Sequence, residues 1–418
     1  MTFIIRLPRG KIMDYAKAMA LLKEHGQTQL LKYYDELSDE QKRILLDEIE
    51  HIDFSIIDRA GKDAKRAQGK ITPADAVTVA DIQEHREEYK KLGLECIKAG
   101  KVAAVLLAGG QGTRLGSDAP KGTFNIGITR KLSIFGCQME TIKSVAAEAG
   151  YNFHLFVMTS RINDAATKAF FKENDFFGYP EDRIHFFIQG VSPACSHDKK
   201  IFLAEKYMPV LTPNGNGGWY SSLIGAGLGE ILKRDGIEWL NVYSVDNVLQ
   251  KICDPVFVGA TKMSGCACSG KVVKKVSPDE KVGVLCKEDG APTIVEYYEL
   301  SDELRNARDA DGELTYRWGV ILNYLFSVEK LNGIDVNDLP YHLADKKVPH
   351  IENGVKVEPT EPNGYKFETL VVDMIKLMGS CLAVEVVREH EFAPVKNRTG
   401  VDSVDSAREL LKLNGVSL

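Results

Sequence analysis

A short apolar strand that runs directly into a glycine-rich loop constrains this chain more than any other feature of its sequence. Residues 102 to 107 are uninterrupted valine, alanine and leucine, and Gly109, Gly110, Gly112 and Gly116 follow at once. A continuous apolar run of this length, bounded by glycine, is typical of a buried strand in an α/β sheet. Glycine has no Cβ, so the backbone beyond the strand can approach a ligand closely.

The loop also carries positive charge. Arg114 lies inside it, and Lys121 follows in the segment Pro120-Lys-Gly122. Backbone N–H groups that point into one concavity bind anions, and basic side chains add the charge that a polyphosphate requires. The segment therefore predicts a phosphate-binding loop at a strand end.

The spacing excludes two well-known phosphate loops. Counting from Gly110, the sixth position is Leu115, where a dinucleotide fingerprint needs glycine or alanine. Lys121 follows proline, whereas a P-loop lysine follows glycine and precedes serine or threonine. The remaining alternative is a turn that only lets a helix pack on the sheet, and the two basic residues weigh against it.

Composition narrows the class of protein. The 418 residues are 44% hydrophobic and 27% charged, which is typical of a globular protein, and no apolar run is long enough to span a membrane. A net charge of -6 without a basic block argues against nucleic-acid binding. We expect a cytoplasmic protein with small-molecule substrates and no membrane partner, and a monomer is the working expectation.

The pattern along the chain predicts three regions. Residues 1–100 read as an α-helical N-terminal region, with a capping box at Ser38 and Gln41, and Gly100 ends the last helix. Residues 101–388 alternate strands and helices, which predicts an α/β domain, and 389–418 form a short C-terminal region. The expected strands are 154–159, 184–188, 239–245 and 382–387; the expected helices are 134–149, 163–174 and 221–234, with antiparallel strands between 265 and 298.

Leu106-Leu-Ala-Gly-Gly-Gln-Gly-Thr-Arg-Leu-Gly116, together with Pro120-Lys-Gly122, resembles the signature of the eukaryotic-type UDP-N-acetylglucosamine pyrophosphorylases. Related UDP-glucose enzymes usually have leucine where this chain has Gln111. The resemblance covers roughly residues 101 to 397. It implies a mixed, mainly parallel Rossmann-like nucleotidyltransferase sheet, GT-A like and flanked by helices. It also implies an enzyme that makes UDP-N-acetylglucosamine and pyrophosphate from UTP and N-acetylglucosamine 1-phosphate.

The resemblance assigns roles to individual residues. The amide of Gln189 would bind the uracil edge, because an amide can satisfy the donor and acceptor of a pyrimidine imide together. The nucleotide-binding residues would be Leu107, Ala108, Gly109, Gly110, Gln189 and Gly215, and the sugar-binding residues Asn216, Gly283, Glu296 and Tyr297. The catalytic cations would be Arg114, Lys121, Lys366 and Lys396.

Asp246 is the expected metal ligand. It follows the predicted strand 239–245, and a carboxylate at a strand end beside a phosphate loop suits a hard divalent cation. A lone aspartate in such a place is more often a helix cap or a turn residue, but the family has a Val-Asp-Asn segment here. The resemblance thus implies Mg2+ or Mn2+ at Asp246.

The chain departs from the family pattern in three places. Gly319-Val320 stands where many relatives have Gly-Asn near the sugar, so an amide contact is missing unless Asn323 or another side chain replaces it. Val372 stands where an aromatic residue is common, and the C-terminal β domain of the family is expected to be shortened or absent. Two alternatives therefore stay open: a pyrophosphorylase for glucose or galactose 1-phosphate, and a catalytically silent protein that binds UDP-sugars.

Overall fold

The computed structural model describes residues 13–58 and 69–418, and the chain divides into two compact units. Unit one combines the described part of Met1–Ala67 with Gly190–Asn216 and Leu339–Leu370, and unit two consists of Gln68–Gln189, Gly217–Asp338 and Val371–Leu418. The chain therefore leaves unit two and returns to it twice. The domain boundaries that the sequence predicts near residues 100 and 388 remain predictions.

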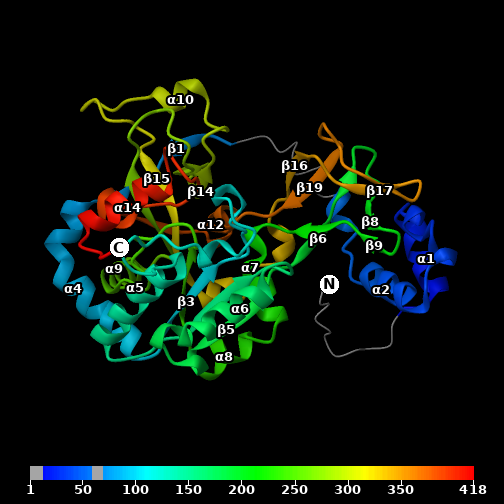
Figure 1. Ribbon diagram of the computed structural model, residues 1–418. Coiled ribbons are helices and arrows are strands. Elements are labelled where there is room, and N and C mark those ends of the chain that lie inside the picture. Colours follow the sequence, from blue (N-terminus) through cyan, green and yellow to red (C-terminus); the bar gives the residue numbers. More distant parts are fainter. Residues whose placement is uncertain (1–12, 59–68) are drawn as a thin grey trace. The chain divides into compact units, whose positions relative to one another are not determined.

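Unit two is built on an eleven-stranded mixed sheet (Figure 1). Along its main path only β15 runs antiparallel to its neighbours, so the sheet is mainly parallel, as predicted. In spatial order the path is β2 (Ala76–Val77), β20 (Cys381–Glu385), β12 (Cys268–Lys274), β15 (Trp318–Ser327), β11 (Trp239–Ser244), β3 (Val102–Leu107), β4 (Leu155–Thr159) and β5 (Ile184–Ile188). The antiparallel hairpin of β13 (Val284–Glu288) and β14 (Ala291–Val295) joins β15, and β1 (Ile71–Pro73) pairs with β13.

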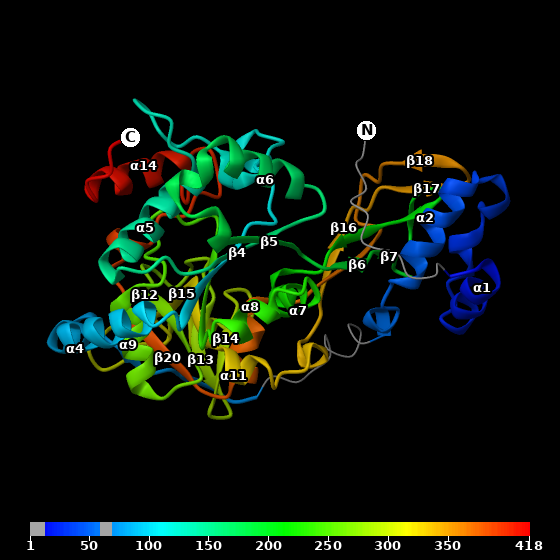
Figure 2. The same ribbon diagram turned by 90° about the horizontal axis from the view of Figure 1, so that it is seen from below.

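One face of this sheet packs under a layer of helices. Val102, Ala104 and Leu106 alternate along β3 and are buried in the same hydrophobic cluster as Ile142 of α5 and Phe257 of α9. Figure 2 shows α4 and α9 lying side by side. The helices of this layer are α4 (Val79–Lys98), α5 (Ile134–Ala149), α9 (Pro255–Ser264) and α14 (Val404–Leu413).

Glycine explains how closely α4 and α9 approach. A Cβ at Gly93 would lie 1.8 Å from the carbonyl oxygen of Pro255, and one at Gly259 would lie 1.8 Å from that of Tyr89. Each helix thus uses a glycine to let the backbone of the other come into contact. The remaining helices of unit two are α6 (Asp164–Glu173), α7 (Trp219–Gly225), α8 (Gly229–Arg234), α10 (Asp302–Asn306), α11 (Val328–Leu331), α12 (Met374–Met378) and α13 (Arg388–Glu391).

The structure differs from the sequence prediction in two places. Within the region predicted as helical, β1 and β2 are strands, because Ile71 pairs with Glu288 and Ala76 with Ala383 on strands of the sheet. The predicted helix 221–234 is instead the two short helices α7 and α8. Gly227 between them has φ +78°, a left-handed conformation that ends a helix.

Unit one contains helices α1 (Tyr15–Glu24) and α2 (Asp39–Glu50), and the predicted capping box at Ser38 and Gln41 is confirmed. Leu22 and Leu45 of these helices are buried in one cluster with Phe367 of a small sheet. That sheet has the order β16 (His342–Lys346), β19 (Gly364–Glu368), β7 (Cys195–Ser196). The other antiparallel pairs are β6 (Val191–Pro193) with β10 (Leu211–Pro213), β8 (Leu203–Glu205) with β9 (Met208–Pro209), and β17 (His350–Glu352) with β18 (Val355–Val357).

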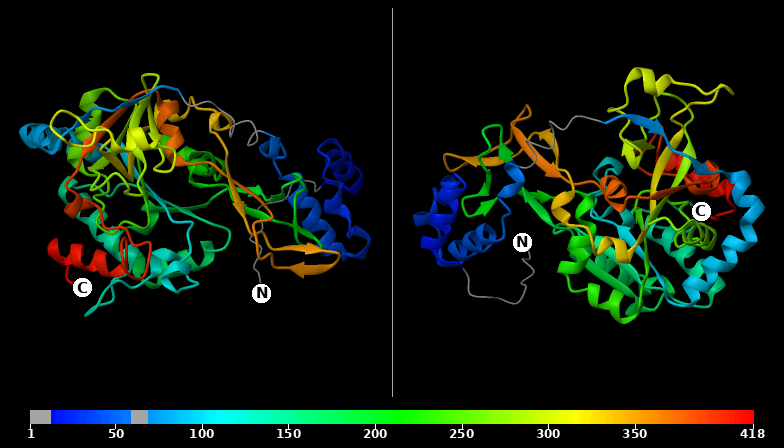
Figure 3. Two further views of the ribbon diagram at one scale, coloured as in Figure 1. Left: turned by 90° about the horizontal axis from the view of Figure 1, so that it is seen from above. Right: turned by 180° about the vertical axis from the view of Figure 1, so that it is seen from behind.

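The C-terminal residues form a helix that packs on unit two (red in Figure 3). Ser403 caps α14, and Val404, Ala407 and Leu411 are buried in the main cluster. The carbonyl oxygen of Leu418 accepts a hydrogen bond from the backbone N–H of Thr129 at 2.9 Å. Of the helices in the described part of the chain, none is both long and apolar enough to span a membrane.

Candidate active site

The glycine loop lies at the carboxyl end of β3 and is closed on itself by backbone hydrogen bonds. The N–H of Gly112 donates to the carbonyl oxygen of Ala119 at 3.0 Å, and that of Lys121 donates to Gly110 at 3.2 Å. Gly116 makes the turn possible with φ +75°. These bonds hold Lys121 beside the start of the loop, although ten residues separate it from Gly110 in sequence.

The predicted nucleotide-binding residues of unit two lie together. Leu107 and Ala108 are buried, and a Cβ at Gly109 would lie 2.7 Å from the side-chain oxygen of Gln189. Gln189 follows β5 directly, and its backbone N–H donates to Thr159 of β4 at 2.8 Å. Glycine at position 109 therefore allows the loop and the Gln189 amide to share one edge of the sheet.

The side-chain amide of Asn163 holds this loop in place. Its Nδ2 donates to the carbonyl oxygens of Ala108 at 2.9 Å and Gly110 at 3.3 Å. Its Oδ1 accepts from the N–H of Ser160 at 2.7 Å. An asparagine before a helix ordinarily indicates a cap, so the sequence alone gives no signal of this tether.

Lys121 and Asp246 meet at the loop. Their Nζ and Oδ2 atoms lie 3.9 Å apart, and both side chains are mostly buried. Burial lowers the pKa of Lys121; Asp246 counteracts this, while Lys396 and Arg114 add to it. Three of the predicted cations and the predicted metal ligand are therefore electrostatic neighbours, and the positive charge there is incompletely compensated.

The segments that carry Asp246 and Lys396 are paired through their backbones. The N–H of Val395 donates to the carbonyl oxygen of Asp246 at 2.8 Å. The Oδ1 of Asn247 accepts from the N–H of Ala393 at 2.9 Å. The Nζ of Lys396 donates to Asp402 at 3.1 Å, and this lysine is partly exposed.

Asp246 suits a divalent cation that takes most of its ligands from substrate phosphates and water. Across residues 13–58 and 69–418 there is no group of three or more histidine, cysteine, aspartate or glutamate side chains placed to hold a metal ion. Mg2+ is commonly bound by one or two carboxylates, with substrate phosphates and water supplying the other ligands. A partly exposed carboxylate beside cations that are predicted to bind phosphate suits that mode of binding.

The predicted sugar-binding residues of unit two form a second group, on the β13–β14 hairpin. A Cβ at Gly283 would lie 3.4 Å from the Oε1 of Glu296 and 3.5 Å from the Cγ2 of Val320. The N–H of Val320 donates to the carbonyl oxygen of Gly283 at 2.9 Å. Glu296 and Tyr297 follow the end of β14. Val320, which departs from the family pattern, is thus hydrogen-bonded to Gly283, one of the predicted sugar-binding residues.

Asn323 does not supply the missing amide. Its Oδ1 accepts from the Nδ2 of Asn241 at 2.7 Å, and its Nδ2 donates to the carbonyl oxygen of Lys251 at 3.3 Å. The side chain is completely buried. The side-chain amide of Asn323 is therefore engaged in an internal hydrogen-bond network.

The other predicted residues belong to unit one. Gly215 has φ +85°, and a Cβ there would lie 2.1 Å from the carbonyl oxygen of Thr369. The N–H of Thr369 donates to Asn214 at 2.8 Å, so this turn is tied to the end of β19. Lys366 lies on β19 opposite Ala344 of β16. The roles of Gly215, Asn216 and Lys366 stay predictions.

The chain is similar to known proteins over most of its length. A model of the family described as UTP–glucose-1-phosphate uridylyltransferase matches residues 53–413. UDP-N-acetylglucosamine diphosphorylase 1 of Arabidopsis thaliana is 37% identical, over 93% of this chain and 81% of that protein. UDP-N-acetylglucosamine pyrophosphorylase of Saccharomyces cerevisiae is 36% identical, over 91% of this chain and 85% of that protein. The crystal structure of the Trypanosoma brucei UDP-N-acetylglucosamine pyrophosphorylase with an inhibitor superposes with a TM-score of 0.80 at 27% identity, covering 97% of this chain and 85% of that chain.

Proposed function

The chain belongs to the family of UTP–glucose-1-phosphate uridylyltransferases, and from this premise we propose that it joins UTP to N-acetylglucosamine 1-phosphate. The products are UDP-N-acetylglucosamine and pyrophosphate. The observation that carries the choice of sugar is that relatives at 36 to 37% identity over most of the chain are named for N-acetylglucosamine.

The arrangement of unit two supports a direct displacement. An oxygen of the sugar phosphate attacks the α-phosphorus of UTP in line with the departing pyrophosphate, so no protein nucleophile is needed. Arg114 and Lys121 would stabilise the leaving pyrophosphate, while Lys396 would stabilise the α-phosphate and the sugar phosphate. Their work is positioning and electrostatic stabilisation, which a partly desolvated loop provides without reorganisation.

Mg2+ or Mn2+ would be held by Asp246 and by phosphate oxygens, and would supply additional positive charge for the transferred group. The short distance between Asp246 and Lys121 places this carboxylate beside the leaving group that we assign to Lys121. Gln189 would hold the uracil edge next to Gly109, and Glu296 would accept from sugar hydroxyls.

The sugar is tested by measuring pyrophosphate release from UTP with N-acetylglucosamine 1-phosphate, glucose 1-phosphate and galactose 1-phosphate. We expect the highest kcat/KM with N-acetylglucosamine 1-phosphate. Equal or faster turnover with glucose 1-phosphate would contradict the choice of sugar. No release with any of the three would contradict the catalytic function itself.

A further inference from the structure

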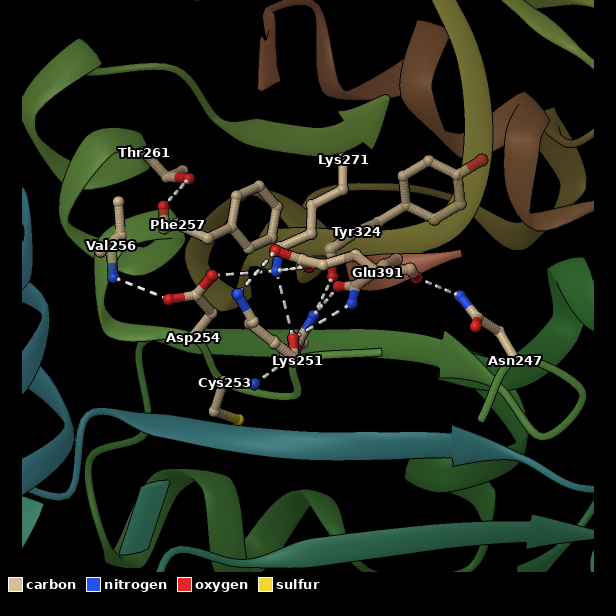
Figure 4. Close-up of polar contacts among 12 residues, drawn as sticks. Asn247, Lys251, Cys253, Asp254, Val256, Phe257, Thr261, Lys271, Tyr324 and Glu391 are labelled. Atoms are coloured by element: carbon tan, nitrogen blue, oxygen red, sulfur yellow. Dashed lines mark hydrogen bonds and ion pairs between the residues drawn. The ribbon is translucent and has the colours of Figure 1, made fainter. Parts of the chain in front are cut away.

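A fully buried lysine lies beneath the segments that carry Asp246 and Lys396. Lys271 is in the middle of β12 and none of its surface is exposed. Its Nζ donates to Glu391 at 2.5 Å, to Asp254 at 3.0 Å and to the carbonyl oxygen of Lys251 at 3.3 Å (Figure 4). All three ammonium donors are used, which a buried cation requires.

The ammonium is charged in this environment. Burial alone would lower the pKa of Lys271, but the nearby carboxylates of Asp254 and Glu391 outweigh burial and raise it. Burial would likewise raise the pKa of Asp254, but Lys271, together with Lys251 and the N–H of Val256, outweighs burial and lowers it. The ring of Phe257 lies against the ammonium, with its centroid 5.3 Å from Nζ. Lys271, Asp254 and Glu391 therefore form one tightly coupled ionic cluster, which we call the Lys271 cluster.

Its two carboxylates come from the two segments that carry predicted catalytic groups. Asp254 ends the segment that begins at Asp246, and its Oδ1 accepts from the N–H of Val256 as the cap of α9. Glu391 ends α13, and the chain continues from there to Lys396. Lys271, on β12, is thus bonded to one residue of the segment that contains Asp246 and to one residue of the segment that leads to Lys396.

Asn247 extends this link toward the site. Its Nδ2 donates to the carbonyl oxygen of Glu391 at 2.7 Å, and its Oδ1 accepts from the N–H of Ala393 (Figure 4 shows the first contact). Next to it, the N–H of Val395 donates to Asp246. Hydrogen bonds and short stretches of backbone therefore connect Lys271 to Asp246 and to Val395, the neighbour of Lys396.

We propose that Lys271 is a positioning residue that fixes the distance between Asp246 and Lys396 by clamping Asp254 and Glu391. It reaches neither substrate nor solvent, so its effect passes through the two segments that it joins. The inference rests on the catalytic roles proposed for Asp246 and Lys396. A misplacement of about 1 Å between catalytic groups can cost about 100-fold in rate, so such a clamp acts on kcat.

A structural ion pair would behave differently. Replacing all members of a buried ionic group by uncharged residues avoids the uncompensated buried charge that removing one partner leaves. The informative variant is therefore the neutral triad, in which Lys271→Met, Asp254→Asn and Glu391→Gln are combined. It removes the clamp without leaving a charge behind.

The experiment measures pyrophosphate release and thermal unfolding of Lys271→Met and of the neutral triad. For both we expect kcat to fall about 10- to 100-fold, while KM for UTP and for the sugar phosphate changes less than about 3-fold. If Lys271→Met does not fold, the neutral triad alone carries the result. A folded neutral triad with the kcat of the wild type overturns the proposal.

Two control variants separate positioning from general damage. Ile142→Ala removes buried volume from α5 in the same hydrophobic layer, and it should lower the melting temperature at unchanged kcat. Lys251→Met removes a partly exposed charge 3.5 Å from Glu391 but keeps the clamp, and its kcat should stay within about 2-fold. An equal loss of kcat in either control overturns the proposal. Wild-type protein that releases no pyrophosphate would instead contradict the proposed function.

Discussion

Two buried lysines of unit two show how one residue type can serve opposite purposes. Lys271 has two carboxylates and a carbonyl oxygen within 3.3 Å of its Nζ. Among the residues that the structure describes, Lys121 has a single carboxylate within 4 Å, that of Asp246 at 3.9 Å. The pKa of Lys271 is raised and that of Lys121 is lowered. The first lysine is fully paired within the protein, and the second is the cation that we propose binds a phosphate of UTP.

The comparison separates groups that hold the site together from groups that act on the substrate. Removing one partner of a buried ionic cluster costs stability, because it leaves the remaining buried charges without full compensation. A cation that the protein compensates incompletely contributes little to the free energy of unfolding, and its removal mainly weakens the binding of an anion. Stability and UTP binding should therefore divide between the two lysines, whereas kcat should depend on both.

The largest expected effect is on stability. Lys271→Met leaves Asp254 and Glu391 buried without their cation, so we expect the free energy of unfolding to fall by about 3 to 5 kcal/mol. The neutral triad should recover most of that loss, because it removes the bare charges as well. Chemical denaturation of both variants measures this. An unchanged free energy of unfolding in Lys271→Met would contradict the comparison.

The second prediction concerns the other lysine. Lys121→Met should lower kcat/KM for UTP by about 10² to 10³-fold, because a preorganised cation at the phosphates is lost. The free energy of unfolding should change by less than about 1 kcal/mol, since the fold does not fully compensate this charge. Steady-state kinetics and denaturation of one preparation provide both values. A large loss of stability without loss of activity would reverse the two roles.

The third prediction separates Asp246 from the carboxylates of the Lys271 cluster. Asp246→Asn should lower turnover on the order of 10²-fold and weaken its dependence on Mg2+ or Mn2+, with the fold intact. Titrating either metal against pyrophosphate release tests this. Turnover like that of the wild type would remove Asp246 from the proposed mechanism.

The smallest effect is a pH dependence. The folded pKa of Lys271 lies above that of an unfolded lysine, near 10.4, so its ionic contribution is complete below that pH and is lost as the pH rises through the folded value. The wild type should therefore lose stability relative to Lys271→Met above pH 10.4, by at most about 1.4 kcal/mol per pH unit. Denaturation curves at pH 9 and above test the sign. A relative gain in stability with pH would show that the lysine is neutral in the fold.

Local pattern predicted much of the fold. The boundaries of β3, α5 and β5 agree with the sequence, because continuous apolar runs, a serine cap and flanking glycines mark them. The assembly of unit one from three separate segments has no local signal, and neither do the edge strands β1 and β2. Those elements depend on partners far away in the sequence.

The site likewise contains residues that the sequence predicts and residues that it does not. Lys121 and Asp246 could be predicted because each is part of a motif beside a strand end, and the structure brings them together. Lys271 could not, because a lone lysine is ordinarily a solvated surface residue. Its partners come from α9 and α13, and only the folded sheet places them around it.

The most direct test of the comparison is the affinity for UTP of two variants at one pH, measured by titration calorimetry. We predict that Lys121→Met weakens UTP binding by about 10- to 100-fold, the value of a lost hydrogen bond to a charged group. The neutral triad at Lys271 should bind UTP within about 3-fold of the wild type, because its charges are compensated inside the protein. Equal weakening in both variants, or in neither, would contradict the division of roles between the two lysines.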